Sequence, residues 1–278
     1  MALEPREATK GPGPGQEVRH GIFGVGPHLV ALPVEAIEDI FILPELHRQP
    51  GARPHERGLA SLRGKALPAL DLRVCFGMSS ALAEIDALVR LLTERERDHR
   101  AWLDELMACV RSDREFTLTR DPQACKFGQW YHAFQTDDAV LRMELERFAA
   151  PHAAIHAIAD TALGLASGGQ KQRAVALVES ARAGLLHELV RLFESTREIL
   201  RRQHREIGVT VAHQERRTVF VVDSAEAVAD LALFAAEDDP LLAGAVATPL
   251  VLRLARWTGA QQPVLVLDHE RVVAGTAA

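Results

Sequence analysis

The chain has 278 residues, of which 47% are hydrophobic and 25% are charged, as is ordinary for a globular protein of one or two domains. A net charge of −6, few aromatic residues and no run of lysine and arginine argue against a nucleic-acid partner. No apolar run reaches the roughly 18 residues of a membrane-spanning helix, so we expect no direct membrane insertion. Three cysteines are too few for a disulfide framework and are typical of a reducing cytoplasm.

The sequence pattern predicts a leader followed by three successive regions. Residues 1–17 are polar and rich in glycine and proline, which predicts a disordered leader. Residues 18–79 contain short apolar runs divided by glycine and proline, as expected for strands of a small barrel. Residues 80–213 predict a helical bundle, and residues 214–278 return to strand patterns. Two β domains of about 60 residues would be marginal alone, so we expect one β domain with a helical insertion.

Turn signals divide the helical region into three long helices. Apolar residues recur at helical spacing from Ile85 to Val110, which predicts the first helix. We expect a loop from about 112 to 136, where an Asp-Pro step interrupts the pattern. Helices are expected over 137–166 and 170–206, with a Ser-Gly-Gly turn at 167–169 between them.

Cys125 lies in the expected loop, with histidines on the helices before and after it. His152 and His156 are four residues apart, so a helix presents both imidazoles on one face, and His99 belongs to the apolar stripe of the first helix. Three imidazoles and one thiolate are a suitable donor set for tetrahedral Zn²⁺. Each signal alone has a plainer explanation, because histidines and cysteines on apolar stripes are often packed core residues. The spacing leaves both interpretations open, whereas Cys109 is expected in the core.

Three motifs of this region resemble the signature of the chemoreceptor zinc-binding (CZB) family: HRAW at 99–102, CKFGQW at 125–130 and HAAIH at 152–156. The resemblance spans roughly residues 85–165 and implies a four-helix bundle that binds one zinc ion. The implied ligands are His99, Cys125, His152 and His156. The residues implied to pack around them are Trp102, Phe127, Gly128 and Trp130. Gly128 would allow a tight backbone turn beside the cysteine.

The two flanks look like the two halves of a CheW-like coupling domain. The first half carries the family's motifs as Ser61 to Gly64 and Pro68 to Arg73. In the second half, residues 224–249 depart from the family's glycine- and valine-rich pattern. Together the resemblances imply an α+β multi-domain protein. It would be a CheW-like double β-barrel of SH3-like subdomains, interrupted by a zinc-binding four-helix bundle.

Arg63, in the tight Leu-Arg-Gly turn of this motif, has two candidate roles. It can form a structural ion pair with Glu38 or Asp39, or it can belong to a partner-binding surface. The acidic residues nearby in the sequence favour the structural ion pair.

The resemblances imply a cytoplasmic adaptor, not an enzyme, recruited to chemoreceptor arrays at the inner membrane. It would couple the cytoplasmic tip of a chemoreceptor to a CheA-type histidine kinase, and homodimerisation through the bundle is a further expectation. Zinc-bound Cys125 would sense oxidants such as hypochlorous acid, or the site would sense zinc itself. One alternative is a purely structural zinc. A zinc hydrolase is disfavoured, because four protein ligands leave no coordination position for water.

Overall fold

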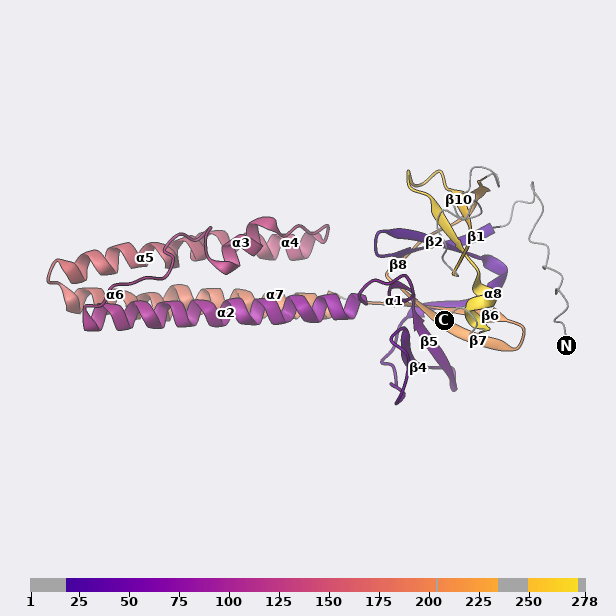
Figure 1. Cartoon of the computed structure of the whole chain (residues 1–278), viewed down its shortest axis with the longest axis horizontal. Helices are drawn as coiled ribbons and strands as arrows, with labels where there is room; N and C mark the ends of the chain where they lie inside the picture. Colours follow the sequence, from indigo (N-terminus) through magenta and orange to yellow (C-terminus); the bar gives the residue numbers. More distant parts are fainter. Residues whose placement is uncertain (1–18, 204, 235–249, 275–278) are drawn as a thin grey trace, which may run out of the picture. The chain divides into compact units, whose positions relative to one another are not determined.

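The computed structural model of the chain describes residues 19–203, 205–234 and 250–274. It divides into a β-rich unit, built from the chain up to Ala81 and again from Arg205, and a helical unit, Leu82–His204 (Figure 1). The expected insertion of a helical domain into one β domain is therefore confirmed. The predicted leader, residues 1–17, lies outside the described residues.

The β-rich unit draws its strands from both ends of the chain. The first flank provides β1 (Arg19–Val25), β2 (His28–Pro33), β3 (Ile37–Ile42), β4 (Glu56–Leu62) and β5 (Lys65–Asp71). The second flank provides β6 (Ile207–His213), β7 (Arg216–Val222), β8 (Ser224–Asp230), β9 (Ala232–Leu233), β10 (Val251–Arg256) and β11 (Val264–Leu267). Three short helical segments accompany them: η1 (Val34–Ala36), α1 (Leu72–Cys75) and α8 (His269–Val273).

Each of the two sheets mixes strands from the two flanks. The strand orders are β8-β1-β2-β11-β10-β9 and β3-β6-β7-β5-β4. Antiparallel pairs β1–β8 and β3–β6 and parallel pairs β2–β11 and β5–β7 join the first flank to the second. Neither flank can complete a sheet alone, so the β-rich unit is one domain whose halves exchange strands.

Both sheets curl until their edges meet. In the six-stranded sheet the edge strands β8 and β9 are separated in sequence only by Leu231, so the two edges must be adjacent. In the five-stranded sheet the chain after β3 returns to the other edge, where His47 pairs with Leu59 of β4. An ion pair of 2.8 Å between Arg63 and Asp39 links the same two edges. This closure confirms the predicted double barrel.

A partly buried ion cluster lies where the β-rich unit is interrupted by the insertion. Arg57 donates to Asp71 at 2.8 Å and forms two further hydrogen bonds of 2.8 Å to Glu206. Asp71 also caps the N-terminus of α1 through the Val74 amide. Because Asp71 precedes the insertion and Glu206 follows it, Arg57 ties the outgoing chain to the returning chain.

Within the described residues, the helical unit contains six α-helices and one π-helical segment. Its helices are α2 (Ala81–Ser112), α3 (Lys126–Ala133), α4 (Ala139–Glu146), α5 (Ala149–Ser167), α6 (Lys171–Ala181) and α7 (His187–Gln203). A π-helical segment, η2 (Arg182–Leu186), joins α6 to α7 in one continuous rod. Figure 1 shows α2 running beside this rod, with α3, α4 and α5 along them. None of the described helices combines the length and apolar character that a bilayer crossing requires.

Three local expectations differ from the structure. The loop expected over 112–136 contains α3, which the Cys125 side chain caps at its first turn. The helix expected over 137–166 is interrupted near Arg147 and Phe148, where it divides into α4 and α5. Residues 207–213, assigned to the bundle, form strand β6 instead, because alternate β-branched side chains pair between β3 and β7.

Candidate metal centre

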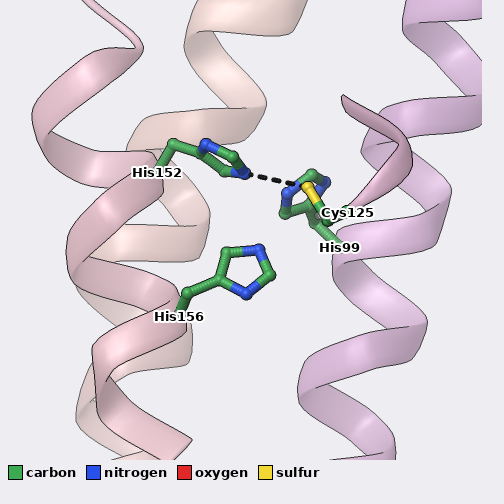
Figure 2. A group of neighbouring side chains, drawn as sticks. All are labelled: His99, Cys125, His152 and His156. Carbon is green, nitrogen blue, oxygen red and sulfur yellow. Dashed lines mark hydrogen bonds between the residues drawn. The ribbon is translucent and has the colours of Figure 1, made fainter. Parts of the chain in front are cut away.

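Four side chains that are far apart in the sequence converge inside the helical unit (Figure 2). His99 comes from α2, Cys125 immediately precedes α3, and His152 and His156 lie one turn apart on α5. Each can offer one ligand atom, and these atoms lie within 4.8 Å of one another. The four residues singled out from their spacing are thus brought together.

Cys125 is held in place as the N-cap of α3. Its sulfur accepts a hydrogen bond from the Gly128 amide at 3.2 Å and lies 3.4 Å from the Pro122 carbonyl oxygen. The same sulfur is 3.3 Å from Nε2 of His152 (Figure 2). The start of α3 therefore directs the sulfur at the imidazoles.

Gly128 is required here by space and not by an unusual backbone angle. It lies within α3 and is absent from the glycines with positive φ. A Cβ at this position would be only 1.9 Å from the Pro122 carbonyl oxygen. The glycine therefore lets the loop pass against the first turn of α3, which refines the expected tight turn.

The hydrogen bonding of His99 leaves one ring nitrogen free for a metal. Its Nδ1 donates to the Arg95 carbonyl oxygen at 2.7 Å; a carbonyl can only accept, so Nδ1 carries the proton. Among the described residues, Nε2 of His99 and both ring nitrogens of His156 are buried without a hydrogen-bond partner. Buried polar atoms rarely remain unpaired, and one metal ion would engage Nε2 of His99 and one of the two nitrogens of His156. The donor set of three nitrogens and one sulfur fits Zn²⁺.

Burial favours the neutral imidazoles that metal binding needs. The exposed fractions of His99, His152 and His156 are 4%, 5% and 1%. Burial, reinforced by the neighbouring histidines, lowers the pKa of His152 to about 3 and that of His156 to about 4. Burial also lowers the pKa of His99. All three rings are neutral near pH 7 and can donate a lone pair to a metal.

The thiol of Cys125 behaves differently from a free reactive cysteine. Burial raises its pKa above the ordinary value, and the Gly128 and Phe127 amides and the Arg95 charge oppose this without reversing it. Without a metal the sulfur is therefore a neutral thiol. A bound cation would supply the charge that favours thiolate.

Trp102 closes one side of the cluster, as its place in the first motif predicts. Its ring centroid is 4.8 Å from that of His156, and its Nε1 donates to the Thr119 carbonyl oxygen at 2.8 Å. The second contact fixes the loop before Cys125 to α2.

Phe127 also packs against the cluster and is 1% exposed. Its ring meets those of His99 and His152 at centroid distances of 5.7 and 4.9 Å, both nearly perpendicular. The ring of Trp130 contacts those of Phe127 and Phe134, so it packs one layer further out from the histidines. Phe193 of α7 contacts His99 and Phe127 but was not predicted, because only tertiary packing distinguishes it from other apolar residues of its stripe.

A cavity of about 320 Å³ adjoins the cluster. Its lining includes Cys125, His99, His156, Trp102 and Lys126. A small molecule in this cavity would therefore lie beside Cys125.

Cys109, by contrast, is buried in the core as expected, beside Glu105.

Arg63 and Glu38 do not pair with each other. Arg63 pairs with Asp39, and Glu38 pairs with Arg217 at 2.7 Å. The Arg63 side chain is 81% exposed, so this pair contributes little to stability. A partner-binding role for Arg63 stays a prediction.

Comparison with known proteins gave matches to two families. A model described as the chemoreceptor zinc-binding domain matches residues 99–163, and a model described as the CheW-like domain matches residues 20–103. A crystal structure of the scaffolding protein TtCheW from Thermoanaerobacter tengcongensis shares 9% identity, over 91% of this chain and 90% of that chain, with a TM-score of 0.39. No curated protein matched the sequence.

Proposed function

Because this chain carries a CheW-like domain interrupted by a chemoreceptor zinc-binding domain, we propose that it is a chemotaxis adaptor whose metal centre senses oxidants. Both families are signalling and adaptor domains, and zinc is the cofactor of the second. The β-rich unit would join a chemoreceptor tip to a CheA-type histidine kinase, in arrays at the cytoplasmic face of the inner membrane.

We assign the zinc ligands to His99, Cys125, His152 and His156, whose ligand atoms lie within 4.8 Å of one another. Bound zinc would hold Cys125 as thiolate and engage Nε2 of His99 and one unpaired nitrogen of His156. Four protein ligands complete a tetrahedral shell, which supports an adaptor over a hydrolase.

The observation that carries the sensing proposal is that Cys125 both faces His152 at 3.3 Å and lines the adjoining cavity. Hypochlorous acid is small enough to enter and react with thiolate. One thiolate and one hypochlorous acid give one sulfenic acid and one chloride ion, with an electron pair passing from sulfur to chlorine. Sulfenic acid is a poorer ligand than thiolate, so the zinc ion would lose one of its four ligands and keep only the three imidazoles.

Two helices can carry this local change along the chain. His99 belongs to α2, which begins at Ala81 soon after α1. Phe193 belongs to α7, which ends at Gln203, and β6 begins at Ile207. The rings of His99 and Phe193 are in contact, with centroids 6.0 Å apart. A shift of His99 would therefore alter the packing of both helices that continue into the β-rich unit.

The test measures released zinc and partner binding on the full chain before and after stoichiometric hypochlorous acid. Wild type should hold near one tightly bound zinc, release it on oxidation, and change its affinity for a receptor cytoplasmic fragment and for CheA. Cys125→Ala should lose most of the zinc beforehand. Cys109→Ser is the matched control, because that cysteine is buried in the same unit but outside the cluster.

Two results would contradict the proposal. Oxidant that releases zinc and unfolds the bundle while leaving partner binding unchanged would identify a structural zinc. Wild type purified without chelator and containing no zinc would remove the sensing mechanism altogether.

A further inference from the structure

A second cluster of potential ligands lies in the β-rich unit, independent of the first. His213 ends β6, and His269 and Glu270 are the first residues of α8. Their ligand atoms lie within 4.8 Å of one another. We propose that these three residues bind a divalent transition-metal ion such as Zn²⁺.

The distances are close to those of a coordinated ion. Nδ1 of His213 is 3.7 Å from Oε1 of Glu270, whereas neighbouring ligand atoms around tetrahedral zinc are about 3.4 Å apart. The two imidazole centroids are 6.4 Å apart, and the rings are nearly perpendicular. Modest side-chain rotations would bring the three atoms to one ion.

The backbone that presents these side chains is anchored on both sides. Val272 and Val273 of α8 are buried in the same core cluster as Val211 of β6. The guanidinium of Arg216 donates to the Ala274 carbonyl oxygen at 2.9 Å and so fixes the end of the helix. The site therefore lies between two packed elements and not on a free loop.

The two imidazoles have no other hydrogen-bond assignment in the described part of the chain. The distance of 3.7 Å between Nδ1 of His213 and Oε1 of Glu270 is too long for a hydrogen bond. An ion pair between His213 and Glu270 would account for their proximity but would give His269 no role. A shared ion engages all three. The side chains of His213 and Glu270 are 24% and 50% exposed, so a hydrated cation has access.

The donor types select the class of metal. Two imidazole nitrogens and one carboxylate oxygen suit Zn²⁺, Ni²⁺ or Cu²⁺, whereas Ca²⁺ and Mg²⁺ prefer oxygen ligands throughout. Three protein ligands leave a position for water or a small anion. The centroid separations in the first cluster are shorter, from 4.9 to 5.8 Å, so we expect the second site to bind more weakly.

The experiment titrates Zn²⁺ into the full chain, already loaded with its tightly bound zinc, by isothermal titration calorimetry. We expect a second, weaker equivalent in wild type. His213→Gln and His269→Gln should weaken it by more than the roughly tenfold effect typical of losing an outer-shell partner. Glu270→Gln, at a half-exposed side chain, tests the carboxylate with little risk to folding. His47→Gln, which removes an exposed imidazole of the same unit, should leave the affinity for the second zinc equivalent unchanged.

Absence of a second equivalent in wild type overturns the inference, as does a second equivalent that all three variants retain. The variants lie in the β-rich unit, and the first cluster lies in the helical unit. Loss of the second equivalent with retention of the first therefore tests this site separately from the proposed sensor.

Discussion

The two histidine clusters of this chain use similar donors in opposite surroundings. In the helical unit the three imidazoles are at most 5% exposed, and three of their nitrogens are buried without a partner. In the β-rich unit the side chains of His213 and Glu270 remain accessible, so water can satisfy them when no ion is bound. Burial thus leaves the nitrogens of the first cluster without water as an alternative partner, whereas the proposed second site can be hydrated when it is empty.

Zinc removal should show the largest difference between the two units. Chelation leaves the buried donors unpaired, so we expect the helical unit to lose several kcal/mol of stability, out of the roughly 10–16 kcal/mol that structural zinc contributes in small peptides. Amide hydrogen exchange should accelerate in α2, α3 and α5. Strands β6 and β7 should keep their protection.

The β-rich unit is the internal control in this experiment. Equal loss of protection in both units would show that they unfold together and would break the comparison. Unchanged exchange in α5 would mean that the first cluster is stable without metal.

The ion pairs of the β-rich unit test whether burial has the same effect on charged groups. Arg57→Ala leaves Asp71 and Glu206 without their shared partner, and these side chains are 2% and 10% exposed. We expect a loss of about 3–5 kcal/mol in the free energy of unfolding, measured by urea denaturation.

Arg63→Ala is the matched control, since its pair with Asp39 also joins strands of this unit but is exposed. We expect at most about 1 kcal/mol from this change. Similar losses in the two variants would show that burial does not control these contributions.

Gly128→Ala tests the space beside the metal centre and should have a smaller effect than zinc removal or Arg57→Ala. The added methyl group would meet the Pro122 carbonyl oxygen, and backbone cannot move aside as a side chain can. We expect about 1–3 kcal/mol of destabilisation and weaker zinc binding, measured by thermal unfolding and chelator competition.

Gly164→Ala provides the opposite case within the same unit. This glycine lies in α5 with no atom within 4 Å of the added Cβ, so alanine should stabilise the helix by up to about 1 kcal/mol. Destabilisation by both substitutions would show that helix context, and not the Pro122 contact, determines the effect at Gly128.

The sequence identified the candidate ligands better than it identified the elements that hold them. The i,i+4 spacing of His152 and His156 already requires a shared helix face. Cys125 was expected in a loop, where an Asp-Pro step interrupts the helical pattern, and it does lie just before α3 as the N-cap, but the expected loop also contains this helix. The short helix depends on a thiol cap and on buried contacts of Phe127, neither of which local propensity includes.

The sequence by itself determined the order of β-rich and helical regions and the types and spacing of the first cluster's donors. These properties follow from periodicity and residue chemistry, which are local. Only the tertiary structure decided that both flanks contribute to both sheets, that Phe193 completes the aromatic packing, and that His213 meets His269. Strand pairing and packing join residues far apart in the chain, and nothing in the local pattern specifies which partners meet.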